Sequence, residues 1–336
     1  MRPPDRLEAP VDRNVLTLDE VAAWSGPPLI LFVGIDTGGS GVHAVFDRWA
    51  AVLAQPWTLR GVDLPPDTPA ATYRRLVRVM RDNPAVHGAV VTAHKLRLYR
   101  ACAADLDRTD PLVGVTHEVN ALATADGCVS GYARDPVALS HVLPALLPRL
   151  PAGDSAGPTV LCLGAGGAAT ALLLTLHLDV TGGDAARPDP PARVTFTDTR
   201  PEALAELREV AGRAGIDASR LSYVTVGSPS DSDALLADLA APALVVNATG
   251  LGKDTPGSPL TGTAPFGADT VAWDLNYRGD LTFLRQAADA GAHAVDGWDY
   301  FVAGWAAALT AVAGVPLTGD LLNRLADAAA AHRPGR

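Results

Sequence analysis

Apolar residues gather along this chain in short runs that end at Gly, Pro or charged residues, and stretches with helical spacing lie between the runs. Short apolar runs bounded by turn signals are typical of buried strands. In the first half, the pattern predicts strands at 29–35, 57–64 and 86–92, helices at 42–53, 70–80 and 96–106, a strand and hairpin within 113–132, and a helix at 135–147. The dipeptide Asp126-Gly127 is the expected hairpin turn.

A second alternation follows a Pro-, Gly- and Ser-rich stretch at 148–158, which is the best candidate for a domain boundary. It predicts strands at 159–163, 193–198, 221–226, 244–248 and 270–275, and helices at 168–178, 201–214, 300–313 and 318–332. Residues 182–191 resemble a surface insertion. Strands that alternate with helices indicate parallel β-α-β units, so we expect two α/β domains. The predicted division is an extension at 1–26, a first domain at 27–150, a second at 151–315, and a C-terminal helix at 316–336 that returns to the first domain.

Composition narrows the class of protein. The chain has 336 residues, 48% of them hydrophobic and 19% charged, with a net charge of −10. The acidic balance disfavours binding to nucleic acid or to an anionic membrane. We see no signal peptide and no apolar run long enough to span a membrane. Three unpaired cysteines fit a reducing compartment, and each is expected to be a small buried hydrophobe. These features favour a cytoplasmic protein, which we expect to be a monomer or homodimer. The histidines show no metal-ligand spacing, so we expect no metal site.

The sharpest motif follows the strand predicted at 159–163 and opens the next helix: Gly164, Ala165, Gly166, Gly167, Ala168 and Ala169. That context is the one a dinucleotide fingerprint requires. Gly164 permits a tight turn, and Gly166 lets the backbone approach a pyrophosphate at the start of the helix. An ordinary Gly-rich turn is the alternative. The fingerprint predicts that the second domain is a Rossmann domain and that these residues bind NAD or NADP.

The strand predicted at 193–198 ends in Asp198, Thr199 and Arg200, where a Rossmann domain distinguishes its cofactors. An acidic residue there accepts hydrogen bonds from ribose hydroxyls and repels a 2′-phosphate. Asp198 therefore favours NAD over NADP. Arg200 leaves the alternative open, because an arginine can accommodate the 2′-phosphate. Asp198 could also be only the N-cap of the helix that starts after it.

Several short motifs follow one another in order along the chain. In the second domain they are the Gly-Ala-Gly-Gly-Ala-Ala turn, the segment Val246 to Gly252 (VNATGLG) and the segment Asp274 to Tyr277 (DLNY). In the first they are Val91 to Lys95 (VTAHK), Glu118 to Ala121 (EVNA) and Gly131 to Asp135 (GYARD). In this order the motifs resemble those of the shikimate/quinate dehydrogenase family. The VTAHK stretch is one residue shorter than the family's Val-Thr-x-Pro-x-Lys and lacks its proline. The resemblance covers almost the whole chain, from about Leu29 to Ala330.

The resemblance implies an NAD(P)-dependent oxidoreductase with a substrate-binding N-terminal domain and an active site in the cleft between the domains. It implies Lys95 and Asp135 as catalytic residues and Asn120 as a substrate ligand. Lysine and carboxylate side chains suit the transfer of a proton during hydride transfer. The resemblance also places Asn247, Ala248, Thr249 and Gly297 beside the cofactor, and Tyr277 at the substrate carboxylate. Alternatively, Lys95 is a solvated lysine at a helix start, and Asp135 caps the helix that continues through Pro136.

The recognition positions depart from the family pattern. Only Ser40, with Thr37, can stand for the family's Ser-x-Ser pair, and Thr92 follows Val90-Val91 where the family has Asn-Val. Gly304 stands at the family's glutamine, and Arg278 follows Tyr277 and offers a substitute anion contact. We therefore expect a secondary alcohol or ketone substrate, cyclic or polyol, other than shikimate. A true shikimate/quinate dehydrogenase, an enzyme that acts on an imine or an amino-sugar-like ring, and a non-catalytic ligand sensor remain alternatives.

Overall fold

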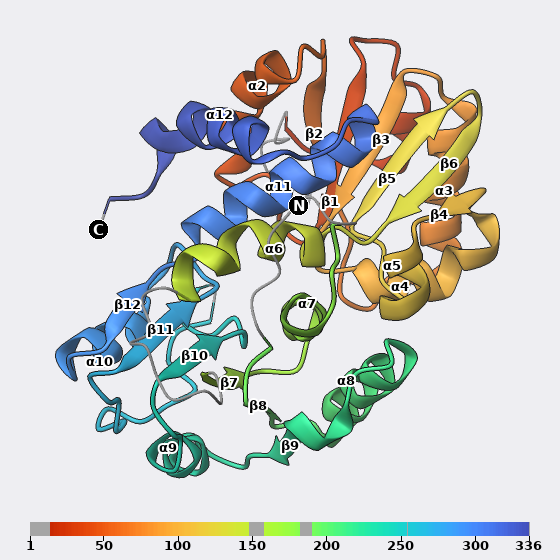
Figure 1. Ribbon diagram of the computed structural model, residues 1–336. Coiled ribbons are helices and arrows are strands. Elements are labelled where there is room, and N and C mark those ends of the chain that lie inside the picture. The colour runs from red at the N-terminus through yellow and green to blue at the C-terminus, as the bar shows by residue number, and fades with distance from the viewer. Residues whose placement is uncertain (1–13, 148–157, 182–189, 254, 336) are drawn as a thin grey trace, which may run out of the picture. The chain divides into compact units, whose positions relative to one another are not determined.

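The computed structural model describes residues 14–147, 158–181, 190–253 and 255–335, and its contacts divide the chain into two compact units (Figure 1). The first unit contains the described residues up to Val113, together with His117–Tyr132 and Ala308–Pro316. The second contains Gly114–Thr116, Ala133–Ala307 and the residues from Leu317 onward. Each unit has its own six-stranded sheet.

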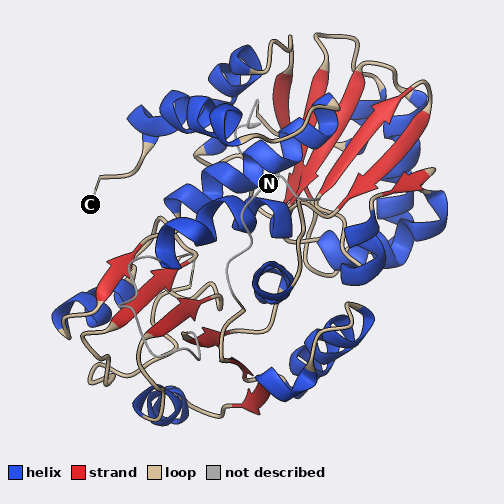
Figure 2. Ribbon diagram, in the orientation of Figure 1, coloured by secondary structure: helices blue, strands red, loops and turns tan. Residues whose placement is uncertain are grey.

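The sheet of the first unit has the strand order β2-β1-β3-β5-β6-β4 (Figure 2). Its strands are β1 Leu29–Gly34, β2 Thr58–Asp63, β3 Val86–Val91, β4 Arg108–Thr109, β5 Ala121–Ala125 and β6 Cys128–Tyr132. β1 pairs in parallel with both β2 and β3, whereas β5 is antiparallel to β3 and β6. All six residues of β1 are buried, as expected for a central parallel strand. The hairpin turns at Asp126 and Gly127, both with positive φ, as the sequence predicts.

The helices that accompany this sheet are α1 Leu18–Ala22, α2 Val42–Val52, α3 Ala70–Asp82, α4 Lys95–Cys102 and α5 Pro111–Thr116, with a short 3₁₀ turn at Ala103–Asp105. One face of α3 is apolar at helical spacing and buries Tyr73, Leu76, Val77 and Met80. The other faces are charged. α5, whose end belongs to the second unit, replaces the strand predicted to begin at Val113, because Asp110 caps it and Pro111 occupies its first turn.

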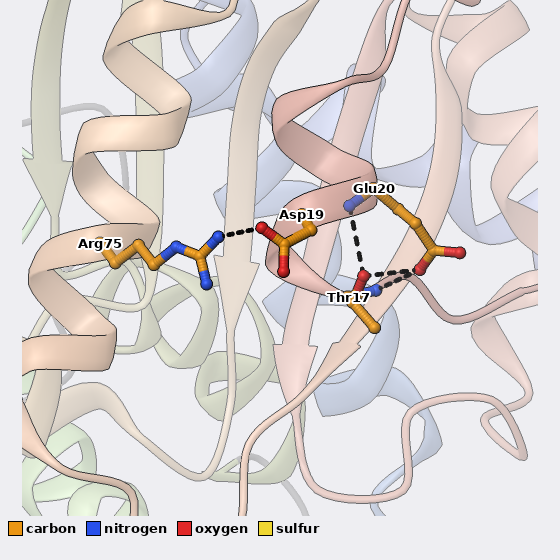
Figure 3. A network of polar contacts seen from close by, with 4 residues as sticks. All are labelled: Thr17, Asp19, Glu20 and Arg75. Atoms are coloured by element: carbon orange, nitrogen blue, oxygen red, sulfur yellow. Dashed lines mark hydrogen bonds and ion pairs between the residues drawn. The ribbon is translucent and has the colours of Figure 1, made fainter.

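The chain before β1 is part of the first unit rather than a separate arm. Val15 pairs in parallel with Gly61 of β2, and Val21 is fully buried. Thr17 and Glu20 form a reciprocal capping box at the start of α1, and Asp19 forms an ion pair with Arg75 of α3 (Figure 3). The rest of the predicted extension, 1–13, lies outside the described residues.

The sheet of the second unit is entirely parallel, in the order β9-β8-β7-β10-β11-β12. Its strands are β7 Thr159–Leu163, β8 Arg193–Asp198, β9 Leu221–Thr225, β10 Ala243–Asn247, β11 Thr270–Asp274 and β12 His293–Val295. The order corresponds to 3-2-1-4-5-6 of a Rossmann fold, with the reversal between β7 and β10. The α/β fold class and the Rossmann assignment of this unit are thus confirmed.

The helices of the second unit are α6 Asp135–Leu146, α7 Gly167–His177, α8 Pro201–Arg213, α9 Pro229–Ala237, α10 Thr282–Asp289, α11 Trp298–Ala313 and α12 Gly319–Ala329, with 3₁₀ turns at Ala218–Arg220 and Ala330–His332. The last residues of α11 belong to the first unit. The sequence pattern misses α9, α10, β4 and β12. They are short, and α9 carries four polar residues in its first five positions, which hides its periodicity.

The grouping of helices differs from the predicted division at two places. α6 groups with the second unit, where Thr175 of α7 donates a hydrogen bond to the carbonyl of Pro136. α12 also groups with the second unit, where Arg333 forms an ion pair with Asp296. The predicted boundary stretch lies almost wholly in 148–157, and most of the predicted insertion lies in 182–189, both outside the described residues.

Two further findings concern composition. Cys102 and Cys162 are buried, as expected, and burial raises the pKa of the Cys102 thiol to about 12. Cys128 is exposed, so its predicted burial is wrong: it starts β6 at the hairpin turn, where no element covers it. Within the ranges that the structure describes, no helix is long and apolar enough to cross a membrane.

Candidate functional site

A cavity of about 440 Å³ opens at the carboxyl ends of the central strands of the second unit. It is lined by residues that follow β7, β8, β9 and β10, that is, by the loops around the point where the strand order reverses. Its lining comprises Gly164, Gly166, Thr197, Asp198, Thr199, Arg200, Val226, Gly227, Ser228, Pro229, Ser232, Ala248, Thr249, Leu251, Ser258 and Pro259. This is where open α/β sheets bind their ligands.

Two glycines of the β7–α7 turn line the cavity, and glycine suits each position for a different geometric reason. Gly164 has φ of +106°, and a Cβ there would lie 2.8 Å from the backbone of Ala248. A side chain is thus excluded by conformation and by space. Gly166 is exposed, and a Cβ on it would meet no atom within 4 Å. Gly166 therefore leaves room beside the start of α7 that a ligand can fill.

α7 presents an anion-binding end to this space. The helix begins at Gly167, its N-cap Gly166 has no side chain, and its first turn contains no acidic residue. Backbone N–H groups at a helix start, together with the helix dipole, favour a negative group such as a phosphate. The residues present therefore fit the pyrophosphate of a dinucleotide.

Asp198 links the end of β8 to the glycine-rich turn. Its Oδ2 accepts a hydrogen bond from the N–H of Ala165 at 2.9 Å, and its Oδ1 accepts one from the N–H of Arg200 at 3.0 Å. The Arg200 side chain, 61% exposed, lies 3.3 Å from the same Oδ1 through Nε. The N-cap of α8 is Arg200, not Asp198, so capping is not the role of this carboxylate.

The loop after β10 is held by a buried polar network. Asn247 is fully buried, and its Nδ2 donates to Asp274 Oδ2 at 3.1 Å and to the carbonyl of Leu251. Its Oδ1 accepts from the N–H and hydroxyl of Thr249. Ala248 and Thr249, which the sequence predicts to lie beside the cofactor, line the cavity. Asn247 is buried and holds the loop through its hydrogen bonds to Thr249 and Leu251. Asn247 does not line the cavity, and its contact with the cofactor stays a prediction.

Asp274 is the charged member of this network. It is fully buried, and burial raises the pKa of its carboxyl to about 6 against the hydrogen bonds from Asn276 and Asn247 that lower it. Asn276 donates its N–H to Asp274 at 2.9 Å and its side-chain amide to the carbonyl of Leu251. The loops after β10 and β11 are thus fixed to each other by paired polar groups.

Gly297 and Tyr277 lie near that second loop. A Cβ at Gly297 would come within 2.1 Å of the carbonyl oxygen of Leu275, so only glycine allows this approach. The half-buried ring of Tyr277 contacts those of Phe301 and Trp298, at centroid distances of 4.4 and 5.5 Å. The following residue, Arg278, is exposed. Neither Gly297 nor Tyr277 lines the cavity described above.

In the first unit, the structure brings Lys95 and Asn120 into adjacent segments. Lys95 is the first residue of α4, and its carbonyl accepts a hydrogen bond from the N–H of Val119 at 3.3 Å. Asn120 is buried, and its backbone bridges β3 and β6 through Val91 and Tyr132. Asp135 is buried at the start of α6 in the second unit. The N-cap of α6 is Arg134, so the capping alternative for Asp135 is not realised.

The predicted substrate residues of the first β-α turn differ in their exposure. Thr37 is fully buried, and both its N–H and its hydroxyl donate to Asp63 Oδ1, at 2.7 and 2.6 Å. Its hydroxyl therefore fixes the turn to the end of β2, and its role in substrate binding stays a prediction. Ser40 and Thr92 are half-buried; Ser40 accepts a 3.4 Å hydrogen bond from Val42, and Thr92 donates to the carbonyl of Val33.

Sequence reasoning missed about half of the cavity lining, notably the segment from Val226 to Pro229 after β9. Ser228 and Asp231 form a capping box at the start of α9. The pattern Ser-x-x-Asp after an apolar strand was the available signal. Among the described residues, no group of three or more His, Cys, Asp or Glu side chains could hold a metal ion.

The fold and the cavity define an α/β protein whose second unit is of the dinucleotide-binding type. No family model matches the chain. The curated shikimate dehydrogenase (NADP(+)) of Methylobacterium radiotolerans is 29% identical over 276 residues, which cover 80% of this chain and 86% of that protein. This relative and the shared fold agree with the ordered motifs, which resemble those of the shikimate/quinate dehydrogenase family.

Solved structures share the fold at lower identity. The quinate dehydrogenase of Corynebacterium glutamicum, solved with NAD, has a TM-score of 0.67 at 17% identity and covers 91% of this chain and 99% of its own. The shikimate dehydrogenase of Aquifex aeolicus has a TM-score of 0.64 at 20% identity and covers 89% of this chain and 97% of its own. The 5-ketofructose reductase of a Gluconobacter strain has a TM-score of 0.63 at 16% identity, over 90% and 99% of the two chains.

Proposed function

We propose that this chain is an NAD(P)-dependent oxidoreductase of the shikimate/quinate dehydrogenase type that acts on the CH–OH group of a polar cyclic or polyol substrate other than shikimate, with NAD preferred over NADP. The observation that carries the proposal is the cavity at the switch point of the second unit. Gly166 opens one side of it, the start of α7 offers N–H groups, and Asp198 lines the side at the end of β8.

A nicotinamide cofactor bound there accepts or gives the hydride. The chain itself supplies orientation and proton transfer. Lys95 would take the proton of the substrate hydroxyl during oxidation and return it during reduction, and its ammonium would stabilise negative charge on that oxygen. Asn120 would orient a hydroxyl, and Asp135 would accept one.

Amino-acid usage supports a special role for Lys95. Of the 27 lysine and arginine residues, only two are lysines, Lys95 and Lys253. In a chain that uses arginine almost everywhere, a lysine in this motif points to a property that arginine lacks. Arginine stays protonated throughout the range in which enzymes work, whereas the pKa of lysine can be lowered enough for the ammonium to release its proton. Proton transfer is such a property.

The preference for NAD is supported by the contacts of Asp198. Its carboxylate is nearly buried at the cavity and holds the guanidinium of Arg200 against itself. A 2′-phosphate at this position would meet the negative charge, and Arg200 is already paired. Ribose hydroxyls, in contrast, would donate to the carboxylate.

Purified protein tests the proposal in two steps. Titration of the protein with NADH and with NADPH measures cofactor binding in the absence of substrate, and the fluorescence of the reduced nicotinamide reports the bound fraction. A panel of polyols and cyclic alcohols with their ketones, including shikimate, quinate and 5-ketofructose, is then followed by the absorbance of the reduced nicotinamide. We expect cofactor binding and turnover of a panel member other than shikimate. Failure to bind either cofactor would refute the assignment, and ligand binding without turnover across a broad panel would favour the sensor.

The altered recognition residues support a substrate other than shikimate. Of the family's serine pair only Ser40 is left, since Thr37 is committed to Asp63. Gly304 offers no side chain where the family has glutamine.

Size-exclusion chromatography with light scattering would test the prediction that the protein is a monomer or homodimer.

A further inference from the structure

A chain of buried hydrogen bonds ends at the residue directly before Lys95. The hydroxyl of Tyr73, on α3, lies 2.8 Å from Nδ1 of His94, and Nε2 of His94 lies 2.8 Å from the carbonyl oxygen of Leu64, just after β2. Tyr73 and His94 are each 1% exposed. Three separate segments of the first unit therefore converge on one imidazole.

Hydrogen-bond chemistry and burial together favour the neutral form of this imidazole. A carbonyl oxygen only accepts, so Nε2 of His94 carries a hydrogen and donates it to Leu64. In the neutral ring Nδ1 is then the acceptor, and the hydroxyl of Tyr73 donates to it. Burial lowers the pKa of His94, the positive charge of Arg97 in the first turn of α4 lowers it further, and the carbonyls of Leu64 and Gly34 oppose this. The ring is hydrogen-bonded at both nitrogens, and its burial favours the neutral form.

The position of His94 gives these bonds a consequence for Lys95. α4 begins at Lys95, and His94 is its N-cap residue, with φ −110° and ψ 10°. The carbonyl of His94 accepts the N–H of Leu98 and closes the first helical turn, while the carbonyl of Lys95 meets Val119 beside Asn120. The backbone angles of His94 therefore set the direction in which the first turn of α4, and Lys95 with it, leaves β3.

We propose that His94 is a positioning residue for Lys95: its bonds to Tyr73 and Leu64 fix the start of α4 and thereby the orientation of the lysine side chain. In this chain the backbone before Lys95 lacks another restraint that the related motif has. Its segment is one residue shorter than Val-Thr-x-Pro-x-Lys and lacks the proline, whose ring would fix a backbone φ angle. A buried side chain anchored at both ends supplies the missing restraint. The inference depends on the proposed function only for what Lys95 does.

Loss of stability alone would not distinguish this role from an ordinary buried hydrogen bond, so the test must observe Lys95 itself. The presence of only two lysines makes this practical. Reductive methylation with ¹³C-formaldehyde labels Lys95, Lys253 and the terminal amine, and NMR spectroscopy follows the dimethyl-lysine signals against pH. Lys253→Arg assigns the two signals. No substrate or cofactor is needed, so the result does not depend on the proposed reaction.

Three variants change the anchor in steps. Tyr73→Phe removes one hydrogen bond and keeps the ring, His94→Phe removes both, and His94→Gln keeps a donor and an acceptor. Asn83→Leu is the matched control: Asn83 ends α3, is buried, and donates to the carbonyls of Val21 and Trp24, away from α4. It should lower the melting temperature at least as much as Tyr73→Phe does, because the Asn83 side chain makes more hydrogen bonds than the Tyr73 hydroxyl.

We expect Tyr73→Phe and His94→Phe to move the Lys95 signal and to shift its titration midpoint by about 0.5 pH units or more, within the normal spread of lysine pKa values in proteins. Lys253 should not move, Asn83→Leu should leave both signals in place, and His94→Gln should restore Lys95 in part. Once a substrate is known, kcat should fall by about 10- to 100-fold in His94→Phe, with cofactor binding unchanged. Folded Tyr73→Phe or His94→Phe protein with an unchanged Lys95 signal and titration would overturn the proposal.

Discussion

The carboxylate of Asp198 accepts a hydrogen bond from the backbone N–H of Ala165, with 2.9 Å between Oδ2 and the nitrogen. This bond ties the end of β8 to the glycine-rich turn after β7, two segments more than 30 residues apart. The other carboxylate oxygen accepts from Arg200, which also lines the cavity. The Asp198 carboxylate and the Arg200 guanidinium are thus paired at the position where a Rossmann unit distinguishes NAD from NADP.

The first prediction concerns this pair. Wild-type protein should bind NAD more tightly than NADP, and Asp198→Asn should narrow the ratio of the two dissociation constants by about 10-fold or more, because a nearby like charge costs more than 1 kcal/mol. Fluorescence titration with the two reduced cofactors measures both constants. Arg200→Ala is the companion variant. A wild-type preference for NADP that Arg200→Ala abolishes would show that the guanidinium, not the carboxylate, decides.

The second prediction separates the two glycines of the β7–α7 turn. Gly164→Ala should lower the melting temperature markedly, because its φ of +106° and a Cβ 2.8 Å from Ala248 combine strain with a clash. Gly166→Ala should leave the melting temperature nearly unchanged, since its Cβ enters open space, but should weaken cofactor binding by about 10-fold or more, the scale of 1.4 kcal/mol. Thermal unfolding and cofactor titration of both variants test this. Unimpaired binding by Gly166→Ala would mean that the cofactor does not approach this glycine.

The sequence predicts most of this architecture for identifiable reasons. Strands such as β1 and β7 are short apolar runs next to glycine-rich turns, so their period and their ends are both visible in the sequence. α5 was missed because its apolar residues, between Asp110 and His117, also fit a strand; Asp110 and Pro111 were the overlooked start signal. α9 was missed because polar residues fill its first turns.

The candidate site was predictable where a recognisable motif reaches the cavity. Gly164 and Gly166 follow from the fingerprint, Asp198 follows from the end of the second strand of the Rossmann unit, and Ala248 and Thr249 follow from the resemblance. The commitment of Thr37 to Asp63, and of Asn247 to Asp274, depends on partners 26 and 27 residues away. Motif spacing says nothing about such partners, so a buried structural residue and a ligand-binding residue look alike in the sequence.

The third prediction concerns pH. Burial raises the pKa of Asp274 from 3.8 to about 6, so the folded protein holds this proton more tightly than the unfolded chain does. Its stabilising contribution is complete below about pH 4, is lost as the pH rises through 6, and is replaced above that by a constant cost of the buried charge. His94 and His141, whose pKa values are lowered by burial, act in the opposite direction over an overlapping range.

The variant Asp274→Asn isolates this contribution, because it cannot titrate and the histidines are common to both proteins. Relative to the variant, wild type should be more stable at pH 4.5 than at pH 7.5, by about 1–3 kcal/mol for a shift of this size. Denaturant unfolding at a series of pH values gives the difference. Parallel stability curves for the two proteins would show that Asp274 remains ionised throughout this range.

The fourth prediction concerns Lys95. Lys95→Ala should lower kcat by about 10²- to 10⁴-fold, the usual effect of removing a positioned acid or base. Lys95→Arg should not restore it, because arginine keeps its proton. Both variants should bind the cofactor normally, since Lys95 belongs to the first unit and the cavity to the second. Lys253→Arg is the matched control. Near-wild-type turnover by Lys95→Ala would remove Lys95 from the mechanism.

The last prediction concerns the substrate and rests on Gly304 of α11. Shikimate and quinate should be poor substrates, because Thr37 donates to Asp63 and no side chain extends from position 304. Each unreplaced hydrogen bond costs about 0.5–1.5 kcal/mol, and more when the group left without a partner is charged, so two losses lower kcat/KM by roughly 10- to 100-fold.

A Cβ at Gly304 would meet nothing within 4 Å, so Gly304→Gln should fold normally. It should raise kcat/KM for shikimate by supplying one missing partner and lower it for the preferred substrate by filling its space. Gly304→Leu, of similar size but apolar, controls for bulk and should lower both. Wild-type turnover of shikimate with kcat/KM near roughly 10⁵ M⁻¹s⁻¹, ordinary for an enzyme, would make shikimate the natural substrate and leave Ser40 sufficient for its carboxylate.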